Sequence, residues 1–257
     1  MKLQRRTLLS GLAAAAVCPI CSNNAASAAE SNGHVKHWTY DGDEGPNHWG
    51  KLTPDHKACD IGAQQSPINL AQPIPSKLKK LDIKWKEFPL SIINNGHTIQ
   101  VNVPPGCTIA EDGITYKLVQ FHFHHPSEHL IDGAALPMEI HFVHFNERMD
   151  LALVLGVFIA EGSPNDLLGK IFSDMPKEKG ESKTVLAINP NNLLPESFDR
   201  FHYQGSLTTP PCSEIINWNV LRSSITASSD QIRAFAALFI NNARPVMPLN
   251  RRFLLQG

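Results

Sequence analysis

The sequence predicts a mainly β fold with peripheral helices (α+β), formed by a single domain around a mainly antiparallel sheet. Short apolar segments alternate with turn residues through the centre of the chain, as they do in antiparallel sheets. Only two segments, both in the later half, have the apolar spacing of a helix. The 257 residues contain no low-complexity linker and no internal repeat, which favours one domain.

The first residues predict export from the cytoplasm. Residues 1–28 combine a positive start at Arg5 and Arg6, an apolar run over 8–20 and small residues at 26–28, as in a cleaved signal peptide. The run is shorter than the ~20 residues of a membrane span, so no transmembrane segment is predicted. The mature domain is therefore expected to cover residues 29–257 and to be periplasmic or secreted.

Two export routes fit this segment. Arg5-Arg6 followed by Thr7-Leu8-Leu9 resembles a twin-arginine signal. An ordinary Sec signal also often begins with adjacent arginines. A lipid anchor at Cys18 or Cys21 is disfavoured because no leucine stands three residues before either cysteine.

The charge of the chain is balanced. With 23 basic and 24 acidic residues, the formal net charge is -1. This balance gives no electrostatic reason to expect a nucleic-acid partner.

The elements are predicted in chain order. Up to about Ala71 the mature sequence is rich in Gly, Pro, Asn, His and Trp without periodicity, which indicates irregular structure over a core. Strands are expected at 92–93, 99–103, 116–124, 138–145 and 151–159, with turn residues at Gly106, Asp112-Gly113 and Asp132-Gly133. Helices are expected at 165–175 and 230–241, the second with Asp230 as its N-cap.

Two of the expected strands carry a histidine pattern. Strict alternation over 120–124 places Gln120, His122 and His124 on one face and two phenylalanines on the other. The segment 139–143 repeats the pattern, with Glu139 and His141 on one face and Ile and Phe on the other. If the strands are neighbours, three histidines share one face.

Three histidines on one face predict a zinc site. Three neutral nitrogen ligands suit Zn2+ and leave one position open for water. Gln120 and Glu139 each stand two residues before a ligand, where an acceptor can take the second imidazole N–H. Histidine is common, however, and His125, His129 and His144 are expected to be structural.

Several motifs resemble those of the alpha-class carbonic anhydrases, in family order from about residue 34 to residue 252. They include the two histidine segments and the following stretches: His37-Trp38-Tyr40, Gly45-Pro46, His48-Trp49, Gln65-Ser66-Pro67-Ile68-Asn69, Asn95-Gly96-His97, Ser127-Glu128-His129, Ser206-Leu207-Thr208-Thr209-Pro210-Pro211 and Arg244-Pro245 with Pro248. The resemblance implies a large twisted, mostly antiparallel sheet. It also implies reversible hydration of carbon dioxide, a small-molecule substrate, by zinc-bound hydroxide, with esterase activity as a side reaction, in a monomer or homodimer.

The resemblance assigns roles to matching positions. His122, His124 and His141 would be the zinc ligands, oriented by Gln120 and Glu139. Thr208 would accept a hydrogen bond from the hydroxide and donate its own proton to Glu128. Four further matches would line the apolar pocket for carbon dioxide: Val143, Val154, Leu207 and Trp218. Thr209 would help to bind the anionic product.

A proton path is also implied. His97 would carry the proton to buffer, because imidazole titrates near neutral pH, and Tyr40, Asn95 and Gln100 would order water along the way. On a regular strand His97 and Gln100 face opposite sides, so a bulge is expected between them. Gln100 stands where the family commonly has Asn.

Three cysteines remain after the signal: Cys59, Cys107 and Cys212. An oxidising compartment permits a disulfide, and spacing alone leaves three pairs possible. The resemblance to secreted members implies a Cys59–Cys212 bridge. It gives Cys107 no partner, so this thiol could be buried or link two molecules.

Two other functions are disfavoured by the sequence. A catalytically silent binding module of the same family would typically lack one or more ligand histidines, and none is missing here. A different zinc hydrolase is disfavoured because the sequence has neither HExxH nor a carboxylate-rich two-metal pattern.

Overall fold

The computed structural model describes residues 37–257. The predicted signal peptide over 1–28, its export route and the alternative anchor at Cys18 or Cys21 lie outside the described residues. Among residues 37–257, no helix has both the length and the apolar composition to cross a membrane.

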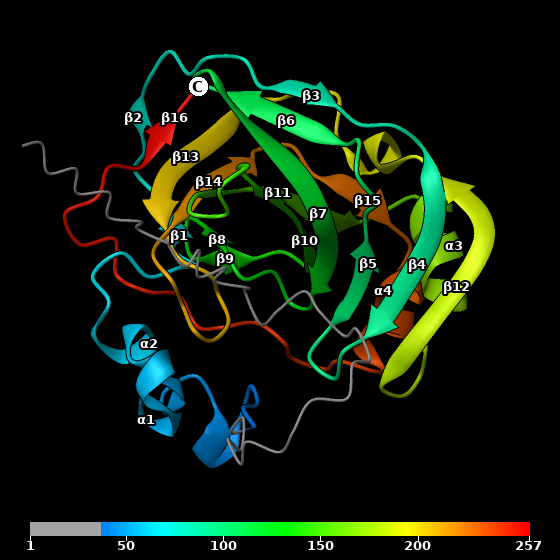
Figure 1. Ribbon diagram of the computed structural model, residues 1–257, viewed down its shortest axis with the longest axis horizontal. Helices are drawn as coiled ribbons and strands as arrows, with labels where there is room; N and C mark the ends of the chain where they lie inside the picture. The colour runs from blue at the N-terminus through cyan, green and yellow to red at the C-terminus, as the bar shows by residue number, and fades with distance from the viewer. Residues whose placement is uncertain (1–36) are drawn as a thin grey trace, which may run out of the picture. The chain divides into compact units, whose positions relative to one another are not determined.

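Most regular structure in the described chain is β-strand (Figure 1). The strands are β1 (Asn69–Leu70), β2 (Ile74–Pro75), β3 (Asp82–Lys84), β4 (Phe88–Asn94), β5 (Ile99–Asn102), β6 (Thr108–Glu111), β7 (Ile114–His124), β8 (Leu130–Ile131), β9 (Ala134–Ala135), β10 (Met138–Phe145), β11 (Ala152–Glu161), β12 (Gly180–Ile188), β13 (Arg200–Gly205), β14 (Ile216–Leu221), β15 (Ile225–Ala227) and β16 (Leu255–Gln256).

The helices are short and peripheral, as predicted. They are α1 (Trp49–Leu52), α2 (Ala58–Ile61), α3 (Asp166–Asp174) and α4 (Ser229–Ala236), with 3-10 turns η1 (Gly42–Glu44), η2 (Pro54–His56) and η3 (Pro190–Leu193). Figure 1 shows α3 and α4 together beside β4 and β12.

A 13-stranded sheet organises the described residues, and its main path runs β12-β4-β5-β7-β10-β11-β14-β13-β16-β2. Most of its pairings are antiparallel, and the exceptions are β11 with β14, β11 with β15, and β16 with β2. The prediction of a large, mostly antiparallel sheet is confirmed. The register sets His141 of β10 opposite His122 of β7 on one side and Gly156 of β11 on the other.

The two faces of β7 and β10 have different environments. Phe121, Phe123, Ile140 and Phe142 are fully buried in one large apolar cluster with α3 and α4. Burying each such side chain contributes about 1.5–3 kcal/mol, so this cluster fixes the strands firmly. Their histidine-bearing face is thereby presented to a second, smaller apolar cluster that includes Trp218.

The predicted strands and turns are confirmed with boundary shifts of a few residues. The segment 138–145 matches β10, and 116–124 falls within β7. Asp112 and Gly113 have φ values of 50° and 81°, and Asp132 and Gly133 have 48° and 86°. Positive φ at both central residues is the requirement of a type I′ hairpin turn, which explains these two dipeptides.

The second predicted helix was placed too far along the chain. Its N-cap is Ser228, not Asp230, because the Ser228 hydroxyl accepts from the Gln231 N–H while the Gln231 side chain accepts from the Ser228 N–H. This reciprocal capping box begins the helix at Ser229. Asp230 lies within the first turn, where it pairs with Arg233.

The N-terminal segment is irregular, as predicted, and short helices interrupt it. Its anchor is Trp49, which is fully buried and donates its indole N–H to the Thr39 carbonyl at 2.9 Å. The predicted bridge between Cys59 and Cys212 is present, while Cys107 is free and buried. The bridge ties α2 to the loop that follows Thr208.

We expect Cys59→Ser to lower the free energy of unfolding by about 2–5 kcal/mol, because the bridge closes a long loop, with the cysteines 153 residues apart. Denaturant unfolding of the oxidised proteins measures this loss. Cys107→Ala is the control that leaves the bridge intact. A non-reducing peptide map that joins Cys107 to either of the other cysteines would contradict this pairing.

Candidate metal centre

The structure brings the three predicted ligands together. His122 and His124 stand on β7 and His141 stands on the neighbouring β10, and one nitrogen of each lies within 4.8 Å of the others. Strand alternation places all three on one face, with the buried phenylalanines behind them. His124 and His141 are each 1% exposed, so the cluster is closed to bulk water on that side.

Each ring has one nitrogen held by an oxygen that can only accept a hydrogen bond. This fixes the tautomer and leaves the lone pair on the other nitrogen. The contacts are His122 Nδ1 to Gln120 Oε1 at 2.8 Å, His124 Nδ1 to the Asn242 carbonyl at 2.8 Å, and His141 Nε2 to Glu139 Oε1 at 2.9 Å. The nitrogens left free to bind a metal are therefore His122 Nε2, His124 Nε2 and His141 Nδ1.

Two buried polar atoms beside the cluster lack hydrogen-bond partners among the described residues. They are His124 Nε2 and Glu128 Oε2, which lie 3.5 Å apart. Glu128 Oε2 is also 3.7 Å from His141 Nδ1. An unpartnered buried polar atom costs about 1–3 kcal/mol, and a cation between these groups would remove that cost. The residues present thus fit a zinc ion with three nitrogen ligands.

The protonation of the rings suits metal binding. Burial, aided by the neighbouring rings of His124 and His141, lowers the pKa of His122 well below its ordinary value. Burial likewise lowers the pKa of His124. Both rings are neutral at neutral pH, which is the ligating form.

Glu139 is the most completely bonded carboxylate of the site. Its Oε1 accepts from His141 and, at 2.8 Å, from His129 Nδ1, while Oε2 accepts the His129 backbone N–H at 2.9 Å. Burial alone raises the pKa of Glu139, but His129 and His141 outweigh it and hold the pKa well below its ordinary value. Gly156 leaves room for the carboxylate, since a Cβ there would lie 3.1 Å from Oε1.

An apolar wall stands beside the histidines. Val143, Val154 and Trp218 belong to one buried cluster, and Leu207 packs against it. The Trp218 ring lies 4.8 Å from that of His141, edge to face, and its N–H donates to the Ser206 carbonyl. The predicted pocket residues are therefore together, next to a ligand.

The predicted hydrogen bond from Thr208 to Glu128 is not found among the described residues. Thr208 is buried in a loop closed by Leu207 N–H to the Ser213 carbonyl and by Cys212 N–H to the Thr209 carbonyl. Glu128 Oε1 instead accepts the Arg244 backbone N–H at 2.8 Å, which directs Oε2 toward the histidine nitrogens.

His97 lies in the turn before β5, so it is not bound by strand alternation. The expected bulge was wrong, because β5 pairs regularly with β4 and β7. The His97 ring stacks on Trp38 with centroids 3.7 Å apart. Burial, reinforced by Lys179 and His37, lowers its pKa to about 4. In this position the imidazole is neutral at neutral pH and accepts a proton weakly.

The other three residues of the implied proton path have local roles: Asn95 and Gln100 form hydrogen bonds to nearby groups, and Tyr40 is half-buried. Asn95 Oδ1 accepts the N–H groups of His97 and Thr98, both at 2.9 Å, and so closes the turn. Gln100 donates to Asn102 Oδ1 at 2.7 Å. Burial and then the Glu128 carboxylate raise the pKa of Tyr40 well above its ordinary value, so it remains a phenol.

Sequence reasoning missed three supports of the site. Asn242 fixes His124 through a backbone carbonyl, which no sequence pattern reveals. His129 orients Glu139, and its other nitrogen lies 2.7 Å from the Tyr203 hydroxyl. Arg244, whose N–H holds Glu128, stands in a family-like motif that marked the place but not the contact.

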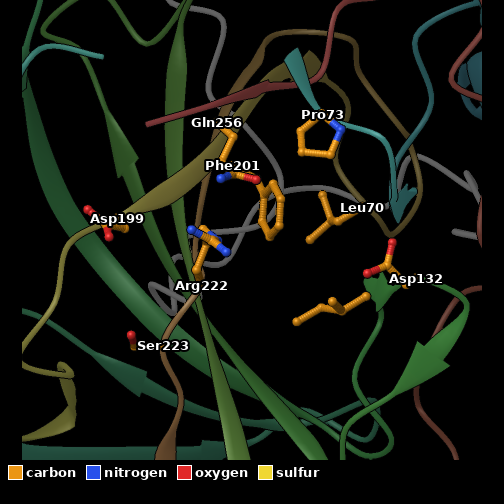
Figure 2. Close-up of a pocket in the computed structure, with 9 residues that line it drawn as sticks. Leu70, Pro73, Asp132, Asp199, Phe201, Arg222, Ser223 and Gln256 are labelled. Carbon is orange, nitrogen blue, oxygen red and sulfur yellow. The ribbon is translucent and has the colours of Figure 1, made fainter. Parts of the chain in front are cut away.

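A cavity of about 370 Å³ lies apart from these residues (Figure 2). Phe201 and Leu70 form apolar parts of its wall, and Figure 2 shows Arg222 and Gln256 beside the Phe201 ring. None of the predicted site residues lines it, so the histidine cluster is the better candidate for chemistry.

Comparison with known proteins finds one family. A family model described as eukaryotic-type carbonic anhydrase matches residues 44–256. A carbonic anhydrase of Pectobacterium carotovorum is 44% identical over 85% of this chain and 90% of its own, and one of Nostoc is 40% identical over 99% and 98%. The structure of alpha-carbonic anhydrase from Thermovibrio ammonificans with the inhibitor sulfanilamide has TM-score 0.83 and 41% identity, covering 86% of this chain and 99% of that one.

Proposed function

The chain belongs to the eukaryotic-type (alpha) carbonic anhydrase family of zinc enzymes, which act on carbon dioxide, and from this premise we propose how its own residues perform the hydration. His122, His124 and His141 hold the zinc through the three nitrogens that carry free lone pairs. Zinc held there supplies the Lewis acidity that lowers the pKa of water to about 7, the value known for carbonic anhydrases.

The residues around the ligands set their strength and geometry. Gln120, Glu139 and the Asn242 carbonyl accept the second N–H of each ring and keep the lone pairs directed inward. Outer partners of this kind typically contribute 10–100-fold to metal affinity or activity. Glu139, fixed by His129, keeps its negative charge and makes His141 a stronger donor.

The wall formed by Val143, Val154, Leu207 and Trp218 receives the substrate. Carbon dioxide is neutral and apolar, so an apolar surface can bind it. Such a surface has no polar groups that would bind the nucleophile in its place. Thr208, on the loop tied by the disulfide, orients the nucleophile, and Thr209 binds the anionic product. Glu128, held by the Arg244 N–H through Oε1, directs its Oε2 toward the ligand nitrogens.

The observation that carries this proposal is the set of three imidazole rings, each with one nitrogen facing inward and the other bonded to an acceptor outside the cluster. Its test is carbon dioxide hydration by the mature chain, residues 29–257, after loading with zinc. We expect hydration that sulfanilamide inhibits. A zinc-replete sample without hydration would favour a silent binding module; esterase activity, expected as a side reaction, does not separate these functions.

The proton path is tested at His97. We expect His97→Ala to slow turnover in weak buffer, by less than the roughly 10²–10⁴-fold of a well-matched general acid–base group, because the pKa of His97 is lowered to about 4. Added imidazole should restore the rate, since it replaces the missing proton carrier. Stopped-flow hydration over a series of buffer concentrations measures both effects. Equal rates for the variant and the original chain in every buffer would rule out the shuttle role.

Two further proposals concern location and assembly. We place the mature enzyme in the periplasm or outside the cell on the basis of the predicted export signal over 1–28, and we propose a monomer or homodimer from the family resemblance. The Cys59–Cys212 bridge supports this placement, because disulfides persist in oxidising compartments.

A further inference from the structure

Asn242 forms hydrogen bonds to the predicted ligand His124 and to both of its neighbours in the chain, although no sequence motif marks it. It follows α4 in a segment without regular structure, yet it is only 1% exposed. Its carbonyl accepts the His124 Nδ1–H at 2.8 Å. This contact belongs to the backbone, so the role of the side chain is a separate question.

The side chain of Asn242 forms hydrogen bonds to the backbone of the residues on both sides of His124. Its Oδ1 accepts the His125 N–H at 2.8 Å, and its Nδ2 donates to the Phe123 carbonyl at 3.0 Å. Its own N–H donates to the His125 carbonyl at 3.0 Å. These bonds continue the pairing of β7 past its last residue and hold the carbonyl of Asn242 against the His124 ring.

The same amide reaches a second element. Asn242 Nδ2 also donates to the His97 carbonyl at 3.0 Å. The turn that carries His97 is bound to the same strand end by Thr98, whose hydroxyl donates to the Phe123 carbonyl. One buried residue therefore joins three parts of the site: its side-chain amide binds the end of β7 and the turn of the expected proton carrier, and its backbone carbonyl accepts from the ring of the ligand.

We propose that the Asn242 side chain is a positioning residue that couples the ligand His124 to the turn carrying His97. The inference rests on the proposed zinc site. A truncated side chain would loosen the Asn242 carbonyl and the turn together, because the one amide makes bonds that help to hold both. Metal retention and proton release should then weaken in the same variant.

Asn94 provides a matched control. It is 5% exposed, its Nδ2 donates to the Pro176 carbonyl and its Oδ1 accepts the Gly96 N–H, each at 2.9 Å. Asn94→Ala thus loosens the same turn and removes two amide hydrogen bonds, against three in Asn242→Ala, but its side chain makes no hydrogen bond to His124 or to the residues beside it.

The experiment compares zinc affinity in Asn242→Ala and Asn94→Ala by competition with a chelator. We expect a loss of about 10–100-fold in Asn242→Ala only. Turnover per bound zinc in weak buffer should also fall in Asn242→Ala and recover with imidazole. Should Asn242→Ala fail to fold, Asn242→Ser keeps a hydroxyl for one bond, and the same pattern is expected at smaller size.

Equal zinc affinity in the two variants, or buffer dependence in Asn242→Ala like that of the original chain, would overturn the coupling. The chelator measurement needs no activity. If the original chain binds zinc but does not hydrate carbon dioxide, the proposed function fails while the positioning of His124 is still decided.

Discussion

Replacing His122 by alanine is expected to abolish stable zinc binding and carbon dioxide hydration together. The variant keeps only two of the three inward nitrogens, and a water molecule in place of the third would be a weaker ligand than a fixed imidazole. Loss of an outer partner already costs 10–100-fold, so loss of a ligand should exceed about 100-fold in both affinity and rate. Metal analysis after dialysis and stopped-flow hydration measure the two losses.

His125→Ala is the control for this variant. His125 follows the ligands directly, and its Nδ1 lies 2.8 Å from the Ile240 carbonyl, away from the cluster. It should retain zinc and hydrate carbon dioxide. Undiminished hydration by His122→Ala would remove His122 from the ligand set.

The largest expected loss of stability lies elsewhere, at Glu111 on β6. Glu111 and Arg200 are buried, at 5% and 4% exposed, with Arg200 Nη2 3.3 Å from Glu111 Oε1. Asn217 and Asn219 of β14 also donate to the carboxylate. Since β6 is not paired with β13 or β14, this polar cluster joins parts of the sheet that share no ladder.

Glu111→Gln should therefore lower the free energy of unfolding by about 3–5 kcal/mol, because Arg200 keeps a buried charge without its partner. Denaturant titration gives the value. The double variant Glu111→Leu, Arg200→Met removes both charges and should be closer to the original chain. A loss below 1 kcal/mol in Glu111→Gln would show that this pair does not hold the sheet together.

The sequence was sufficient to predict those strands in which apolar and polar residues alternate without interruption. In β7 and β10 the phenylalanines and the polar residues separate cleanly, so face, register and ligands could all be predicted. The strands β13 and β14 were missed, although Phe201 and Tyr203, then Trp218 and Val220, alternate in the same way. Arg200 and Asn219 are buried while Gln204 is exposed, so the polar side of this alternation does not form a uniform solvent face.

The outer parts of the site were predictable only in part. Gln120 and Glu139 act two residues from their partners, so strand geometry reveals them. Asn242 acts on His124 across 118 positions through a carbonyl, which carries no side-chain signal. The bulge expected at His97 was wrong because strand alternation does not extend back from 99–103 to His97: β4 ends at Asn94, and Gly96 adopts a φ of 87° in the turn that carries the histidine.

The most direct test of the proposed metal centre is anomalous diffraction at the zinc edge from crystals of the zinc-loaded protein. We predict one strong peak about 2.1 Å from His122 Nε2, His124 Nε2 and His141 Nδ1. A second group of potential ligands, His129, Glu139 and His141, lies close by. A peak at that second group, or no peak among the three predicted nitrogens, would contradict the assignment.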